Sequence, residues 1–363
     1  MREENKVKNI CFIYSDITTT GGIEKSISVI ANELCKINEY NISVLSIKQS
    51  SNKTFFDFDE RVEIDYIYQN KDEKENIFKT VKKIRKYLKD NKIDVVIVAN
   101  IAINIMAVPA ILFSQIKLIS WEHFSFDDET SNKHIKLART LTVIFSNYII
   151  VLTKCDEKRY LNKYKFLKST KIKQIYNPIV QKNYEREFGK ETKEILTIGH
   201  FLPVKGYDLL LQVVELVLKE KKEWKWIIIG DGKYEEEFKK KIRESNLEER
   251  VIIKSRVKHV EDYYKNAEIY VNTSRNEGFA LTILEAKAYK LPVVSFRIPS
   301  ILELLDNGEN DLLIQSYNVN NMKEKIVELI ENEQKRKEYS YMPVNNEKNL
   351  KINYIIEQWK NLL

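Results

Sequence analysis

The sequence has few of the residues that build disulfide frameworks or zinc sites. Its 363 residues include three cysteines and four histidines, which are far apart and form no CxxC pair. The spacing therefore indicates reduced thiols and predicts no metal ion, although a site assembled from distant residues stays open. These residues are Cys11, Cys35, Cys155, His123, His134, His200 and His259.

Long hydrophobic runs are also missing. No apolar segment reaches the roughly 20 residues that span a bilayer, and the start, MREENKVKN, lacks a signal-peptide pattern, so we expect a cytoplasmic protein. The net charge of +7 is mild for this length, and no basic stripe with interleaved aromatics indicates nucleic-acid binding. The modest positive charge favours phosphorylated substrates or an anionic membrane face.

Two series of alternating strands and helices fill the chain. Because parallel crossovers are right-handed, they predict an α/β protein with two tandem, doubly wound parallel sheets and a cleft between them. The expected strands are 9–15, 42–47, 95–99, 117–121, 148–152 and 171–176, then 195–199, 226–229, 251–254, 268–271 and 291–296. The expected segments are a first domain at 1–176, a charged linker at 177–193, a second domain at 194–344 and a helical tail at 345–363.

A glycine turn follows the first strand. Gly21 and Gly22 precede a helical pattern that begins at Ile23, so the turn is a candidate anion-binding corner. It does not contain GxGxxG, which disfavours a nicotinamide enzyme. A plain tight turn is the alternative interpretation.

The most informative stretch runs from Thr273 to Phe296. A polar loop with Glu277 and Gly278 leads into a helical apolar pattern that begins at Phe279, and this helix carries Glu285 about two turns beyond Glu277. Unpaired N–H groups from Gly278 to Leu281 would hold a phosphate, and Glu285 would accept hydrogen bonds from ribose hydroxyls. The alternative is an ordinary amphipathic helix with two solvated glutamates.

Three other features carry chemical information. His123 follows the strand 117–121, and an imidazole with a pKa of about 6.5 suits a sugar hydroxyl or a shared proton. Lys205, after the strand 195–199, is placed to reach a diphosphate. The basic helix at 77–92 indicates either membrane contact or a solvated face whose apolar stripe packs on the sheet. A structural histidine and a solvated lysine are the alternatives for His123 and Lys205.

Taken in order, the motifs resemble those of the GT-B-fold retaining glycosyltransferases, in particular the bacterial family 4 enzymes that build capsular or other exopolysaccharides. The E-x7-E element is the specific motif, and the others are weak singly. The matching segments are Gly21-Gly22-Ile23-Glu24, Glu122-His123, Asn177-Pro178, Gly199 to Gly206, Gly230-Asp231-Gly232 and Glu277-Gly278-Phe279 with Glu285.

The resemblance implies two Rossmann-like domains and transfer of a sugar from a nucleotide-sugar, with UDP as the expected nucleotide, to a glycan or lipid-linked glycan. The first domain would bind the acceptor and the second the donor, and the C-terminal helix would pack back on the first domain. No cofactor and no metal are expected. Peripheral contact with the inner face of the plasma membrane is expected.

The resemblance also implies roles for individual residues. His123 and Glu277 match the catalytic positions, where they would position and stabilise the reacting sugar without forming a covalent intermediate. Glu285 matches the ribose-binding carboxylate and Lys205 the phosphate-binding lysine. The other matched donor-binding residues are Gly22, His200, Gly278, Phe279, Ala280, Leu281 and Thr282.

Three positions depart from the family pattern. His200 stands where arginine is usual, which weakens one phosphate contact or makes it pH-dependent. Tyr289 and Lys290 replace a small residue and a helix-capping glycine, and we expect little functional consequence. Two other functions stay open, a nucleotide-sugar 2-epimerase of the same fold and a non-catalytic subunit of glycan assembly.

Overall fold

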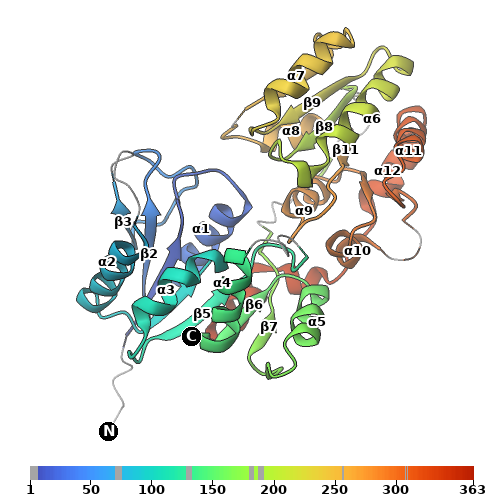
Figure 1. Cartoon of the computed structure of the whole chain (residues 1–363). Helices are drawn as coiled ribbons and strands as arrows, with labels where there is room; N and C mark the ends of the chain where they lie inside the picture. Colours follow the sequence, from blue (N-terminus) through green and yellow to red (C-terminus); the bar gives the residue numbers. More distant parts are fainter. Residues whose placement is uncertain are drawn as a thin grey trace. The chain divides into compact units, whose positions relative to one another are not determined.

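The computed structural model divides the chain into two compact units (Figure 1). Unit 1 comprises Met1–Pro178 and Asn349–Leu363, and unit 2 comprises Ile179–Lys348. The structure describes residues 7–69, 76–127, 133–179, 184–186, 192–255, 257–306, 308 and 310–363. Residues 180–183 and 187–191 of the predicted linker lie outside the described residues.

Unit 1 is built on a parallel seven-stranded sheet in the order β3-β2-β1-β4-β5-β6-β7. Its strands are β1 (Lys8–Tyr14), β2 (Tyr40–Lys48), β3 (Val62–Tyr68), β4 (Val95–Val98), β5 (Lys117–Trp121), β6 (Tyr148–Val151) and β7 (Ile172–Gln174). All four residues of β4 are buried, as expected for a parallel strand covered on both faces. The strand order reverses between β1 and β4, and ligands of such sheets bind at the carboxyl ends of the strands at this point.

The helices of unit 1 include one from the end of the chain. They are α1 (Gly22–Leu34), α2 (Ile77–Asp90), α3 (Asn104–Ile111), α4 (Lys133–Phe145), α5 (Lys154–Lys163) and α13 (Ile352–Lys360). Figure 1 shows α13, in red, among the green elements of this unit. Trp359 of α13 is fully buried and meets the Trp121 ring edge-on, with 4.9 Å between ring centroids. The helix therefore completes the core beside β5.

Unit 2 contains a parallel six-stranded sheet in the order β10-β9-β8-β11-β12-β13. Its strands are β8 (Glu194–Ile198), β9 (Lys225–Ile229), β10 (Val251–Lys254), β11 (Ile269–Asn272), β12 (Val293–Phe296) and β13 (Leu313–Ile314). Its helices are α6 (Tyr207–Glu220), α7 (Glu235–Glu244), α8 (Glu261–Asn266), α9 (Leu281–Ala288), α10 (Pro299–Leu305), α11 (Val319–Glu331) and α12 (Glu333–Tyr341). The strand order reverses between β8 and β11.

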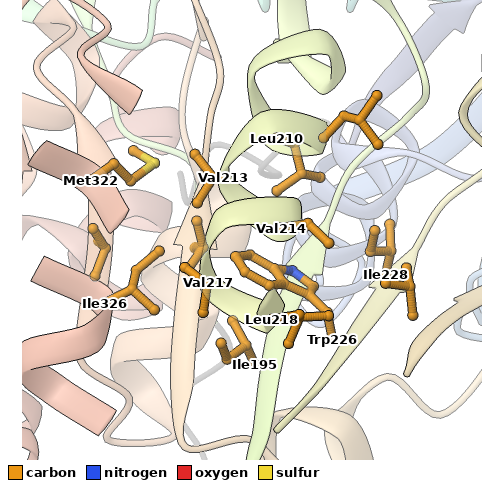
Figure 2. Packing of buried hydrophobic residues seen from close by; sticks show 14 of the residues in the cluster. Ile195, Leu210, Val213, Val214, Val217, Leu218, Trp226, Ile228, Met322 and Ile326 are labelled. Carbon is orange, nitrogen blue, oxygen red and sulfur yellow. The ribbon is translucent and has the colours of Figure 1, made fainter. Parts of the chain in front are cut away.

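The core of unit 2 forms where α6 packs against the sheet and α11. Figure 2 shows Val213, Val214 and Val217 of α6 near Trp226 of β9 and near Met322 and Ile326 of α11. The apolar residues of α6 recur at helical spacing, so one helix presents them to both neighbours. This packing fixes the start of α6, which lies next to the loop carrying Lys205.

Part of the predicted linker packs on unit 2. The Arg186 guanidinium is buried, donates to Ala267 O, and lies 3.8 Å from the Glu268 carboxylate. Tyr184 contacts the ring of Tyr289, with 5.2 Å between centroids. The charged local sequence did not indicate this burial, because the partners of Arg186 lie far along the chain.

Candidate active site

The first group of site residues lies at the carboxyl ends of β8 and β11, where the strand order of unit 2 reverses. The Lys205 ammonium donates to Glu277 Oε2 over 2.6 Å, and the Ser274 hydroxyl donates to Glu277 Oε1 over 2.6 Å. The Glu277 side chain is only 9% exposed, so its pairing with Lys205 is shielded from water more than a surface ion pair. Two residues predicted separately therefore form one ion pair.

The turn that carries Lys205 is fixed to the loop after β11. The 3₁₀ helix η2 (Pro203–Lys205) ends at Gly206, whose backbone is left-handed with a φ of 66°. The Thr273 hydroxyl donates to Lys205 O over 3.1 Å. A Cβ atom at Gly206 would lie 2.1 Å from Thr273 O, so both the backbone conformation and this close approach require glycine.

The helix α9 begins at Leu281, two residues later than the apolar pattern from Phe279 predicts. Phe279 and Ala280 are buried, and their loop turns before the helix starts. The Leu281 N–H, predicted to be open to a phosphate, already donates to Phe279 O over 2.8 Å. The partly exposed members of this segment are Gly278, Leu281, Thr282 and Glu285. They leave one side of the loop and helix accessible to a ligand.

Glu285 lies inside α9, as the sequence predicts, and its orientation is fixed by a residue that the sequence did not single out. The buried Tyr264 hydroxyl of α8 donates to Glu285 Oε2 over 2.8 Å. Tyr264 stands in a segment for which no element was predicted, and nothing in its local pattern relates it to Glu285.

His200 is paired with an acidic residue. Its Nδ1 atom lies 2.8 Å from Asp231 Oδ1, in the loop after β9. The two loops approach closely, because a Cβ atom at Gly230 would lie 1.8 Å from Gly199 O. The motifs around Gly199 and Gly230 therefore serve one local contact between the ends of β8 and β9.

In unit 1, His123 follows β5 and is almost completely buried. Its ring lies 4.3 Å from the Trp121 ring between centroids, and its Nε2 atom has no hydrogen-bond partner in the described part of the chain. Burial lowers the pKa of His123 to about 3. The lowered pKa disfavours a shared proton near neutral pH and favours the alternative of a hydrogen bond to a sugar hydroxyl. A neutral imidazole with an unpaired Nε2 atom is suited to one hydrogen bond with a ligand.

The carboxylate beside His123 belongs to a buried network that sequence reasoning missed. The Tyr160 hydroxyl donates to Glu122 Oε2 over 2.7 Å, and the Arg139 Nε atom lies 3.3 Å from the same oxygen. Burial raises the pKa of Glu122 to about 7, against the lowering effect of the Arg139 charge. The network ties the end of β5 to α4 and α5, which fixes the backbone before His123.

The Glu24 carboxylate links the residues on either side of the glycine turn. The Glu24 carboxylate is buried in the first turn of α1 and accepts hydrogen bonds from the hydroxyls of Tyr14, over 3.2 Å, and Thr19. A Cβ atom at Gly21 would lie 2.7 Å from Glu24 Oε2, so a larger residue there would displace this carboxylate. Gly22 is exposed at the start of α1.

Among the described residues, no group of three or more His, Cys, Asp or Glu side chains is arranged to hold a metal ion. None of the helices found there is long and apolar enough to cross a bilayer.

Comparison with known proteins identifies the family. Residues 181–342 match the family model of the group 1 glycosyl transferases. The chain is 32% identical over 364 residues to an uncharacterized glycosyltransferase of Haemophilus influenzae, covering 98% of this chain and 100% of that protein. The chain is a group 1 glycosyltransferase. This glycosyltransferase is also 26% identical over 371 residues to the amylovoran biosynthesis glycosyltransferase AmsD of Erwinia amylovora, covering 98% of this chain and 99% of AmsD.

A solved structure supports the fold of this glycosyltransferase. A mutant of S. aureus TarM, crystallised with fondaparinux, alpha-GlcNAc-glycerol and UDP, superposes with a TM-score of 0.80 at 17% identity, covering 98% of this chain and 99% of the TarM chain. Together with the two parallel sheets, this likeness shows the predicted GT-B fold.

The environment of His123 makes the stability of this glycosyltransferase sensitive to acid. The pKa of about 3 in the folded protein lies below the usual value of about 6.5, so only the unfolded chain binds a proton between these values. The contribution is fully present above pH 6.5 and is lost as the pH falls, at up to about 1.4 kcal/mol per pH unit. We expect His123→Gln to lose less stability than wild type between pH 7 and pH 5 in urea unfolding.

The matched control is His259→Gln, because His259 is exposed. It should keep the acid sensitivity of the wild type. If His123→Gln also keeps it, His123 does not have the lowered pKa, and a role in proton transfer at neutral pH becomes tenable again.

Proposed function

We propose that this glycosyltransferase is a retaining enzyme that moves a sugar from a UDP-sugar to a glycan or lipid-linked glycan in bacterial surface polysaccharide synthesis. The observation that carries the proposal is the Lys205–Glu277 ion pair beside the accessible side of the α9 segment. The amylovoran function in the name of AmsD supports the polysaccharide, and the UDP bound by TarM supports the nucleotide.

Unit 2 would bind the donor and unit 1 the acceptor. The proposed donor residues of unit 2 are Lys205, His200, Glu285 and the segment from Gly278 to Thr282, and Gly22 is the donor residue proposed in unit 1. His123 would hold a hydroxyl of the reacting sugar through its unpaired Nε2 atom. Since burial keeps His123 neutral, it would act by binding and not as a base.

Glycosyl transfer leaves negative charge on the departing diphosphate. Lys205 and the backbone N–H groups near the start of α9 would stabilise that charge without a cofactor or metal. Both oxygens of Glu277 accept hydrogen bonds from protein groups, so the carboxylate is better placed to orient the sugar than to form a covalent bond. In a retaining reaction the acceptor would attack from the face that the diphosphate leaves, with a donor phosphate oxygen taking its proton.

The direct test of the donor site is Glu285→Ala. Loss of a carboxylate that binds the ribose hydroxyls should raise the Kd for UDP by about 10- to 100-fold, the size of a hydrogen bond to a charged group. Calorimetry with UDP, ADP and GDP measures it. Glu248→Ala removes an exposed glutamate of unit 2 and serves as control. Unchanged affinity in Glu285→Ala would remove this residue from the site.

Transfer itself is tested with purified enzyme, UDP-sugars and a lipid-linked glycan. A new glycosidic bond with the anomeric configuration of the donor supports the proposal. An inverted product would contradict the retaining mechanism. Incubation with the donor alone tests the 2-epimerase alternative, because only an epimerase would produce an epimeric nucleotide-sugar under that condition.

A peripheral membrane contact through α2 is part of the proposal. Its apolar residues Ile84 and Leu88 are buried, which accounts for the stripe seen in the sequence. The exposed side of α2 carries lysines, and its first two residues, Ile77 and Phe78, are 55% and 80% exposed. Such a side suits the headgroup region of an anionic leaflet on the inner face of the plasma membrane.

Charge reversal tests the membrane contact. The double variant Lys82→Glu/Lys86→Glu should lower binding to vesicles containing anionic phospholipid by about tenfold or more, since each lysine contributes about 1 kcal/mol. Sedimentation with vesicles measures binding, and Lys258→Glu in unit 2 is the control because Lys258 is exposed. Binding that is equal in the wild type and the double variant would exclude α2 as the contact.

A further inference from the structure

Tyr264 of α8 contacts two of the proposed donor-binding residues. Its hydroxyl lies 2.8 Å from Glu285 Oε2 and 3.2 Å from Thr282 O, and its side chain is 1% exposed. Burial raises the pKa of Tyr264 well above its usual range, so the hydroxyl stays protonated at neutral pH. The single hydroxyl proton has two acceptors within reach, and the Glu285 carboxylate oxygen is the nearer and the charged one.

The Tyr264 ring is held in place by other aromatic rings. Tyr289, directly after α9, lies parallel to it, with 5.4 Å between centroids and 5° between planes. The Tyr184 ring packs on the Tyr289 ring. The ring centroids of Tyr270 and Tyr264 are 6.0 Å apart. Close-packed rings in a core leave few alternative orientations, so the core fixes the position of the Tyr264 hydroxyl. Tyr289 is also the residue that replaces the small residue of the family pattern.

We propose that Tyr264 is a positioning residue of the donor site, which holds the Glu285 carboxylate in the orientation that accepts hydrogen bonds from the ribose hydroxyls. This inference rests on the proposed role of Glu285. A glutamate side chain loses rotamer freedom when it is fixed, and a carboxylate oriented beforehand loses less of it on binding. Tyr264 would act through Glu285 and would not touch the nucleotide.

The variant Tyr264→Phe removes only the hydroxyl and keeps the stacked ring. We expect the Kd for UDP, measured by calorimetry, to rise about five- to tenfold, the size of one ordinary hydrogen bond. KM for the donor should rise by a similar factor, while kcat at saturating donor stays within about twofold, because the bond acts on donor binding before and during transfer. Tyr68→Phe is the matched control. It removes a buried hydroxyl that is paired with the Thr80 hydroxyl in unit 1.

A nucleotide without ribose hydroxyls distinguishes positioning from packing. 2′,3′-Dideoxy-UDP should bind wild type and Tyr264→Phe equally, because it has no ribose hydroxyl that could donate a hydrogen bond to Glu285. Likewise, Tyr264→Phe/Glu285→Ala should bind UDP no more weakly than Glu285→Ala, since the two residues act through one contact.

The outcomes separate the two proposals. If the wild type binds none of UDP, ADP and GDP, or if Glu285→Ala binds like the wild type, the proposed donor site fails. If Glu285→Ala weakens binding and Tyr264→Phe does not, only the positioning role is wrong. An equal loss of UDP and dideoxy-UDP affinity in Tyr264→Phe would mean a packing role and would also overturn the inference.

Discussion

Glu277→Gln should lower kcat by about 100- to 1000-fold, the effect of removing one preorganised electrostatic group from an active site. The amide keeps the size of the carboxylate but loses its charge, so Lys205 loses its ionic partner and the Ser274 hydroxyl meets a weaker acceptor. The Kd for UDP should change less, because Lys205 keeps its charge for the diphosphate. Initial rates at saturating donor and calorimetry measure the two quantities.

A matched control for this variant is Glu248→Gln, an exposed glutamate in the same unit. It should turn over at the wild-type rate. Turnover of Glu277→Gln at that rate would contradict the catalytic role of Glu277. A loss of UDP affinity as large as the loss of kcat would instead make Glu277 a binding residue.

Gly206→Ala should cause the largest loss of stability. Its Cβ atom would lie 2.1 Å from Thr273 O, and its left-handed backbone is unfavourable for alanine. Overpacking and backbone strain together predict a loss of about 2–5 kcal/mol in the free energy of unfolding. Lys205 directly precedes Gly206 in the chain, so a shift of the backbone here would also move the Lys205 side chain. Transfer activity should therefore fall as well. Thermal or urea unfolding of the purified variant measures the loss.

Gly308→Ala separates the two causes. Gly308 also has a positive φ, of 85°, but a Cβ atom there would meet no atom of the described residues within 4 Å. The control should therefore lose only the cost of backbone strain, about 1–2 kcal/mol. If both variants lose the same amount, the contact with Thr273 contributes nothing and strain accounts for the whole effect.

Apolar patterning predicted most strands of the two sheets but missed β3 and β13. The bounds of β5 and β10 are confirmed, because each is a short apolar run between polar residues. The edge strand β3 was missed although the alternation of apolar and charged residues in VEIDYIY is itself a strand signal, and β13 was missed because it has only two residues. The late start of α9 was missed because Phe279 fits the helical pattern although it is buried in the loop.

In the candidate site, the sequence motifs could be predicted but the contacts made by tertiary packing could not. Lys205, Glu277 and Glu285 were found because each stands in a motif. Their partners depend on tertiary packing, so neither the Lys205–Glu277 ion pair nor the hydrogen bond from Tyr264 was visible in the sequence. The neutral state of His123 was also hidden, because the pKa depends on a burial that spacing does not report.

The place of α13 has a consequence for the synthesis of the chain. Unit 2 is one continuous segment, whereas unit 1 needs residues from both ends of the sequence. Trp359 is fully buried against Trp121, so the core beside β5 stays incomplete while the ribosome is still translating unit 2. Domains usually fold in the order in which they are made. Here the unit that is begun first is the one that is finished last.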